Sequence, residues 1–498
     1  MTAVSTAERH DNPQLPGRVR TGRLPNGRVG LAILATAAVA SSIGMFLDVS
    51  KETTGVLALV LLLSLIFLRM HIGFALLVSA MMGLWALRDF GVVTSTVSRL
   101  PFQTVAQWTL SVIPMFVFMG LLLWRSGVTE KLYDVARTWL GWMPGGLAVG
   151  TNLAGAGLAS VSGSTVGTTH ALARIGIPEM LRAGYDKRIA IGSVLAAGLP
   201  GQLIPPSITL VVFAGLAQVP VGEQLLAGVG PGIAVAALFS IALVLAAVIL
   251  GRKTPKTVAA EVGTPDTMRD RWRALVSIWP VPVLVLVVVV GMFSGIFTAT
   301  EAGAAAAMVA LFVVLFSRRR DRPWGAVNEA AVGTIASTGS IFLMLLGATA
   351  LSRMLPLTGL TTGFTDWTVG LGLSAWQFIA LMTVVYLILG MFLDGLAIML
   401  LTVPLLMPTL AYLDISLLWF GVFVVFAAEI AVITPPVGIL SYIVHGVAQD
   451  PEVNLGNKIS LRDVFTSVAW VIPVALLFIV LLVMFPEIAT YIPSQMGG

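Results

Sequence analysis

The sequence has no cysteine and few charged side chains. Only 11% of its 498 residues are Asp, Glu, Lys or Arg, whereas soluble domains carry about 25%. The absence of Cys excludes disulfides, thiolate metal sites and thiol chemistry. The scarcity of charge, with a hydrophobic content of 57% and a mean hydropathy of +0.96, excludes an ordinary soluble domain. We therefore expect one integral membrane unit.

Motifs for catalysis and nucleotide binding are also missing. No Gly-rich loop ends in Gly-Lys-Ser or Gly-Lys-Thr, so the chain shows no ATPase of its own. No serine stands in a pattern with His and Asp that indicates a nucleophile. The histidines lack the spacing of transition-metal ligands; they are His10, His71, His170 and His445. We therefore expect neither an enzyme, nor ATP, nor an organic cofactor, nor a transition metal.

The net charge of +5 does not indicate a nucleic-acid partner, because Lys and Arg stand in short runs between apolar segments. Such runs report membrane topology. Residues 1–28 are polar and basic, so we expect a disordered cytoplasmic tail. Residues 29–52 predict an extra N-terminal transmembrane helix. We favour an uncleaved anchor, and a signal peptide cleaved near Ala38–Ser41 is the alternative.

Long apolar segments predict an all-α polytopic membrane protein. Two less regular stretches, 150–177 and 394–411, predict helix-turn-helix hairpins that enter the membrane and return. The amphipathic stretch 126–142 predicts either a span or a helix that lies along the interface or braces the two halves. The predicted spans are 29–47, 53–69, 72–88, 108–124, 132–149, 190–217 and 226–250 in the first half, and 275–296, 302–317, 333–351, 376–393, 416–446 and 465–485 in the second.

A basic stretch over 251–273 divides the chain into the halves 53–250 and 274–498. Its charge predicts a cytoplasmic linker. Arg318–Arg320 lies two spans later, which returns it to the same side. If 29–47 runs outward from a cytoplasmic N-terminus, the two halves begin on opposite sides of the membrane. That is the inverted-repeat architecture of many secondary transporters.

A short polar motif followed by Pro-Pro occurs once in each half. Ser162-Gly163-Ser164 precedes Ile204-Pro205-Pro206-Ser207, and Asp394-Gly395 precedes Thr434-Pro435-Pro436. The interval from Gly163 to Pro205 nearly equals the interval from Gly395 to Pro435. Proline removes backbone donors and frees carbonyls, and broken helices inside a membrane are tolerated where they line a protected polar site. A single copy would be read as a kink, but paired breaks predict an ion and substrate site.

Four ionisable residues are isolated in apolar sequence. Such residues inside a membrane are costly, so they usually have a partner or a function. For Glu301 and Arg353 a function and a position at the membrane edge are equally favoured. Asp394 and Glu429 lie beside the repeated breaks, and there a function is favoured.

Several ordered motifs over residues 53–485 closely resemble the large membrane subunit of TRAP (tripartite ATP-independent periplasmic) transporters. They are Ile113-Pro114-Met115-Phe116, Pro144-Gly145-Gly146-Leu147, Ile177-Pro178-Glu179-Met180, Gly184-Tyr185-Asp186-Lys187, Ile204-Pro205-Pro206-Ser207-Ile208, Gly390-Met391-Phe392-Leu393-Asp394 and Thr434-Pro435-Pro436-Val437-Gly438.

The resemblance implies a permease that imports a small organic anion, a carboxylate, by symport with Na⁺. It implies a multi-pass protein of the bacterial inner membrane, surrounded by lipid, with two protein partners: a small membrane subunit and a periplasmic substrate-binding protein. The implied fold is an elevator-type transporter with two re-entrant hairpins, near 150–177 and near 376–411.

The resemblance also implies site residues. The first Na⁺ site would use Ser162, Gly163, Ser164, Gly201, Ile204 and Pro206, largely through backbone oxygens. The second would use Gly395, Ala431, Thr434 and Pro436. The substrate would lie near Ser162, Ser164, Ser207 and Asp394.

The chain departs from the family pattern in the second break. Ala431 stands where glycine is expected; a backbone ligand survives that change, whereas close packing is placed in doubt. Ala299 stands where proline is usual.

The rival hypotheses are a proton-coupled transporter that uses Asp394 or Glu429, a membrane-embedded enzyme and an assembly scaffold. The sequence leaves the choice of organic acid open.

Overall fold

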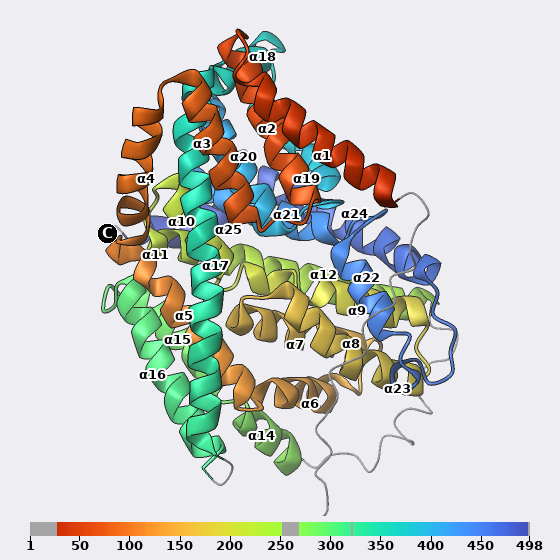
Figure 1. Cartoon of the computed structure of the whole chain (residues 1–498). Coiled ribbons are helices and arrows are strands. Elements are labelled where there is room, and N and C mark those ends of the chain that lie inside the picture. The colour runs from red at the N-terminus through yellow and green to blue at the C-terminus, as the bar shows by residue number, and fades with distance from the viewer. Residues whose placement is uncertain (1–26, 251–267, 320–321, 497–498) are drawn as a thin grey trace, which may run out of the picture.

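The computed structural model describes residues 27–250, 268–319 and 322–496 (Figure 1). All regular secondary structure in these residues is helical. Residues 1–26 of the predicted tail and 251–267 of the predicted linker lie outside the described residues, as does Arg320. The last two residues of the predicted tail, Gly27 and Arg28, are helical and belong to α1, and residues 268–273 of the predicted linker belong to α14.

The first half contains α1 (Gly27–Gly44), α2 (Lys51–Phe67), α3 (Ile72–Leu87), α4 (Phe90–Val105), η1 (Trp108–Ser111), α5 (Val112–Arg125), α6 (Val128–Leu140), α7 (Gly146–Ser162), α8 (Thr165–Arg182), α9 (Lys187–Ala197), η2 (Pro200–Gln202), α10 (Ile208–Ala217), α11 (Val221–Ala227) and α12 (Val229–Leu250). The second contains α14 (Met268–Ser277), α15 (Pro280–Phe293), α16 (Ala299–Ser317), α17 (Pro323–Thr358), α18 (Leu360–Gly370), α19 (Ala375–Gly390), α20 (Gly395–Tyr412), α21 (Leu417–Ile433), α22 (Ile439–Val447), α23 (Pro451–Asn454), α24 (Leu461–Met484) and α25 (Glu487–Ser494).

The apolar runs form the helices, and proline and small polar residues end them. In the described residues six helices are long and apolar enough to cross a membrane, or seven if α14 and α15, bent by 54°, form one span. The predicted spans 190–217 and 416–446 are each broken: η2 and a loop separate α9 from α10, and Thr434–Gly438 separates α21 from α22. Pro-Pro supplies no backbone donor at either break, so the helix cannot continue there.

The predicted span 132–149 is wrong, whereas the bracing helix that the sequence also allowed is confirmed. Helix α6 ends at Leu140, and α7 begins at Gly146. The Trp139 indole of α6 donates to the Arg271 carbonyl of α14 at 3.1 Å and meets Trp272 edge-on. Helix α6 therefore joins the first half to the second.

The two halves repeat the same order of helices under a single shift in residue number. The shift that carries Ser164 onto Asp394 also carries Pro205 onto Pro435. Ser164 and Asp394 each cap a helix of 18 residues, and the Pro205–Pro206 and Pro435–Pro436 bonds are both cis. Helices paired by this shift are α2 with α15, α3 with α16, α6 with α18, α7 with α19, α8 with α20, α10 with α22 and α12 with α24.

The two halves are interlocked, because helices of one half pack against helices of the other. The long helix α17 runs along α3, and its counterpart contact joins α16 to α5. The α3–α17 backbones approach closely at glycine: a Cβ on Gly347 would lie 2.6 Å from the Gly73 carbonyl oxygen. In Figure 1 the paired helices α6 and α18 lie at opposite ends of α17.

A second group of helices holds the two hairpins. It comprises α7 to α12 and α19 to α24, and we call it the hairpin group. Helices α2 to α5 and α15 to α18 form the α17 group. Helix α21 is almost wholly buried in the middle of the hairpin group. Its aromatic residues carry much of that core, since Phe426 meets Phe478 at 4.7 Å between ring centroids and Phe423 meets Tyr386 at 6.0 Å.

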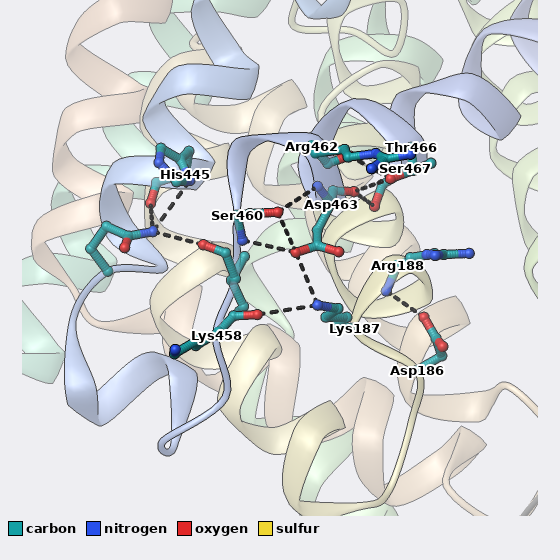
Figure 2. Close-up of polar contacts among 12 residues, drawn as sticks. Asp186, Lys187, Arg188, His445, Lys458, Ser460, Arg462, Asp463, Thr466 and Ser467 are labelled. Carbon is teal, nitrogen blue, oxygen red and sulfur yellow. Dashed lines mark hydrogen bonds and ion pairs between the residues drawn. The ribbon is translucent and has the colours of Figure 1, made fainter.

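A polar strut also ties the halves together inside the hairpin group (Figure 2). The Lys187 ammonium at the start of α9 lies 2.9 Å from an Asp463 carboxylate oxygen of α24 and donates to the Lys458 carbonyl at 3.1 Å. The same Asp463 oxygen accepts hydrogen bonds from the backbone and hydroxyl of Ser460. The strut fixes the loop before α24 against α9.

Candidate functional site

The first hairpin turns at Gly163 and Ser164, between α7 and α8. Gly163 has a φ of +62°, and a Cβ there would lie 2.5 Å from the Ile208 side chain, so the turn requires glycine. Ser164 is extended, and its hydroxyl accepts a hydrogen bond from the Gly167 backbone at 3.1 Å. This serine is therefore the N-cap of α8.

The second hairpin turns just before α20, where Asp394 is the N-cap. Its carboxylate accepts a hydrogen bond from the Ala397 backbone at 2.9 Å. A carboxylate is stabilised at a helix N-terminus by the macrodipole.

The two N-caps give the repeat its true register. Ser164 precedes Pro205 by the same interval by which Asp394 precedes Pro435. Gly163 and Gly395, which the sequence spacing paired, are not equivalent: one ends α7, whereas the other begins α20. Aspartate in the second half thus stands where the first half has a neutral serine.

The Pro-Pro breaks hold polar side chains that bond within their own half. The Ser207 hydroxyl is buried, donates to the Gln202 carbonyl and accepts from the Leu210 backbone. The Thr434 hydroxyl donates to the Ile430 carbonyl at 2.9 Å. The roles of Ser207 in substrate binding and of Thr434 in ion binding stay predictions.

Glu429 of α21 lies close to both hairpin tips. One carboxylate oxygen accepts a hydrogen bond from the hydroxyl of Thr165, the first residue of α8, at 2.7 Å. The other lies 3.6 Å from the place that a Cβ on Gly395 would take. The ion pairs of the described residues do not include Glu429. The Glu429 carboxylate thus lies beside one hydroxyl and close to the N-termini of α8 and α20. Oxygen ligands of this kind suit a hard cation.

The close packing placed in doubt by Ala431 is preserved. In the first half Gly201 is the small partner, since a Cβ on it would lie 2.5 Å from the Cβ of Ala159 on α7. In the second half Ala431 takes the place of Gly201, and the glycine is on the opposing helix: a Cβ on Gly390 would lie 2.1 Å from the Cβ of Ala431. Glycine is thus at the Pro-Pro break in the first half and on the opposing helix in the second half. The two segments therefore approach closely in both halves.

The other two isolated charges also have hydrogen-bond partners, one local and one on a distant helix. Glu301 is exposed and forms a capping box with Thr298, accepting from its backbone at 2.8 Å. The Arg353 guanidinium is also exposed and donates to the Gln103 amide oxygen at 2.7 Å. Glu301 thus caps α16, and Arg353 joins α17 to α4.

Sequence reasoning missed Gln202, which lies beside the first break. It is buried; its side-chain oxygen accepts from the Thr209 hydroxyl at 3.1 Å, and its backbone carbonyl accepts from Ser207. A search for isolated charges passes over a neutral amide. The signal was nevertheless present, because Gln202 is a polar residue in an apolar run directly after Gly201.

Repeated broken helices that place polar turns around a carboxylate define the class: a multi-pass membrane transporter. The match to a family model, over residues 59–488, makes the assignment particular. The chain belongs to the tripartite ATP-independent periplasmic transporter family, DctM component. It is a transporter permease and not an enzyme.

Relatives support the same assignment. The chain is similar to the C4-dicarboxylate TRAP transporter large permease protein DctM of Pseudomonas aeruginosa, with 31% identity over 80% of this chain and 88% of that one. It is similar to the sialic acid TRAP transporter permease protein SiaT of Haemophilus influenzae, with 27% identity over 88% of this chain and 68% of that one. The fold resembles the crystal structure of the Alcanivorax borkumensis YdaH transporter, with a TM-score of 0.58 and 17% identity over 80% of this chain and 89% of that one.

Proposed function

We propose that this chain is the large permease of a tripartite system that imports a small organic anion by symport with Na⁺ across a bacterial inner membrane. Relatives are named for C4-dicarboxylates, sialic acid and 2,3-diketo-L-gulonate, which are all organic anions. The observation that carries the proposal is Glu429, which reaches both hairpin tips. One carboxylate shared by two repeats suits a site filled by cations and their co-substrate.

Na⁺ binds in two places, one in each repeat. The backbone between η2 and α10, and between α21 and α22, is not helical, so its carbonyls are outside the helical ladder. Unwound carbonyls of this kind hold Na⁺ in transporters. The first site uses Ser162, Gly163, Ser164, Gly201, Ile204 and Pro206; the second uses Gly395, Ala431, Thr434 and Pro436.

The anion binds between the tips, near Ser162, Ser164, Ser207 and Asp394. The N-termini of α8 and α20 are at these tips, and the positive end of a helix dipole favours an anion. Asp394 and Glu429 oppose an anion, so bound Na⁺ must offset their charge. Na⁺ therefore binds first and completes the substrate site.

Transport follows an elevator mechanism in which the hairpin group moves against the α17 group. The hairpins α7–α8 and α19–α20 are re-entrant, and the halves are inverted relative to each other with the N-terminus in the cytoplasm. Support comes from α6 and α18, paired helices at opposite ends of α17. A separate small membrane subunit and a periplasmic binding protein complete the system, as the family description implies.

The test is thermal unfolding of the purified full-length chain in Na⁺ and in K⁺ at equal ionic strength. A ligand that binds only the folded state stabilises by about 2.7 kcal/mol at a hundredfold excess over its Kd. We expect the unfolding temperature to rise saturably with Na⁺ and not with K⁺, and we expect a smaller rise in Thr434→Val. The matched control is Thr383→Val, because Thr383 is equally buried and donates to the Ile379 carbonyl at 2.8 Å, as Thr434 does to Ile430.

Glu429 also favours a second candidate, a proton-coupled transporter with Glu429 or Asp394 as the relay. Equal unfolding temperatures in Na⁺ and K⁺ would contradict Na⁺ coupling. If the unfolding temperature then depended on pH in the wild type and not in Glu429→Gln, the proton-coupled mechanism would replace it.

A further inference from the structure

A cavity of about 250 Å³ separates the second hairpin from the α17 group. One wall comes from α2, α17 and α18, and includes Leu63, Phe364 and Trp367. The opposite wall comes from the hairpin helices α19 and α20, and includes Val385, Leu401 and Leu405. The cavity thus lies at a boundary between two helix groups and away from the hairpin tips.

The chemistry of the walls selects an apolar ligand. Thr402 carries the one hydroxyl on the lining, which donates to the Ile398 carbonyl at 2.8 Å and pairs with the Tyr386 hydroxyl at 3.1 Å. This hydroxyl therefore does not call for a polar ligand. Apolar cavities of this kind exclude water and take up apolar molecules. The volume is below the ~300–1,000 Å³ of sites for drug-sized ligands, so it suits an alkyl chain.

The surroundings select the bilayer as the source of that chain. Helices α17 and α20 are apolar enough to cross a membrane. The neighbouring face of α19 exposes Val384 and Ile388, which places lipid beside the cavity wall. Trp367 on the opposite wall is 51% exposed, and indole rings are enriched where a membrane meets water. A lipid can thus extend one chain inward while its headgroup stays outside.

We propose that this cavity binds one acyl chain of a membrane phospholipid. The chain fills the gap between α2 and α18 on one side and α19 and α20 on the other. Because it contacts both walls, its binding stabilises the second hairpin against the α17 group. This binding requires neither Na⁺ nor the transported anion, so it is independent of the proposed transport function.

The probe is a phosphatidylethanolamine with a photoreactive diazirine near the end of one acyl chain. It is titrated into the full-length chain in detergent, irradiated, and the labelled peptides are identified by mass spectrometry. We expect saturable labelling of the cavity-facing residues of α19 and α20. The exposed residues Val384 and Ile388 should show labelling that rises without saturation.

A matched pair of variants tests the cavity itself. Val385→Phe fills the cavity, and Val384→Phe adds the same ring on the exposed face of the same helix. Saturable labelling should fall about tenfold in Val385→Phe, the factor that 1.4 kcal/mol represents, and stay unchanged in Val384→Phe. Leu63→Trp fills the cavity from α2, so an effect of Val385→Phe on hairpin folding is distinguished from loss of the site.

Three results would overturn the proposal. The first is that none of the cavity residues shows saturable labelling. The second is wild-type labelling in both filled variants. The third is displacement of the probe by a free fatty acid of the same chain length at concentrations where unlabelled phosphatidylethanolamine does not compete, which would assign the cavity to a free fatty acid.

Discussion

The two hairpin tips share a backbone device and differ in chemistry and in exposure. Each begins a helix at an N-cap that precedes a Pro-Pro break by the same interval in the sequence. At the first tip the cap is the exposed, neutral Ser164, whereas at the second it is the partly buried Asp394. The breaks show the reverse pattern, since Pro205 and Pro206 are buried and Pro436 is exposed. The repeat therefore fixes where the backbone opens, and the side chains make the two half-sites unequal.

Glu429 increases this inequality. It belongs to the second half, yet its hydrogen bond is to Thr165 of the first tip. The equivalent position of the first half is Leu199, which is buried and cannot return the contact. Both carboxylates of the site thus come from one half.

The largest effect is expected at Gly390 and Ala431, where glycine and alanine have exchanged places relative to the first half. Gly390→Ala places a Cβ against Ala431 and should lower the free energy of unfolding by about 3 kcal/mol, near the upper end for overpacking. Chemical or thermal unfolding measures it. The second substitution Ala431→Gly in the same chain should restore most of the loss, and the exchange would be disproved if Ala431→Gly gave no rescue.

A smaller loss is expected at the link between the halves. Thr165→Val leaves the Glu429 carboxylate without its hydroxyl donor, which should cost about 2 kcal/mol. Thr334→Val is the control, because the Thr334 hydroxyl donates to a backbone carbonyl of its own helix. In a Glu429→Gln background the cost of Thr165→Val should shrink. An equal cost of Thr165→Val in both backgrounds would show that the hydrogen bond carries no coupling.

The third prediction separates the capping role of Asp394 from its charge. Asp394→Ala should cost about 1 kcal/mol, whereas Asp394→Ser should be nearly neutral, because Ser and Asp cap helices equally well. The Ser variant gives the second tip the cap of the first. We expect it to keep the unfolding temperature in K⁺ and to lose part of the Na⁺-dependent rise. An unchanged response to Na⁺ would show that the charge of Asp394 does not contribute to Na⁺ binding.

The smallest effect is expected at the strut between α9 and α24. Lys187→Met should cost about 1 kcal/mol, since the Lys187 and Asp463 side chains are 35% and 15% exposed. Arg125→Met breaks the Arg125–Glu329 pair, whose side chains are 43% and 56% exposed, and should cost about half as much or less. Thermal unfolding at low and high salt compares them, and a larger loss in Arg125→Met would contradict this ranking.

Local features of this protein could be predicted from the sequence because they depend on neighbouring residues. Apolar runs predicted the membrane helices, and Pro-Pro predicted both breaks. Ser164 and Asp394 lie at their tips as expected, since a cap bonds only to an amide three residues further on. The ordered motifs also indicated the family, which the comparisons confirm.

The tertiary structure alone decided the rest, because those contacts depend on how distant segments meet. Thr165 and Glu429 are 264 residues apart, and no local pattern predicts that they share a hydrogen bond. The sequence left α6 open between a span and a brace. The end of α6 at Leu140 contradicts the predicted span, and its contact with α14 makes it a brace. Ala431 placed close packing in doubt, because the sequence does not show which residue lies opposite it. With Gly390 opposite it, the same residue keeps the two helices in contact.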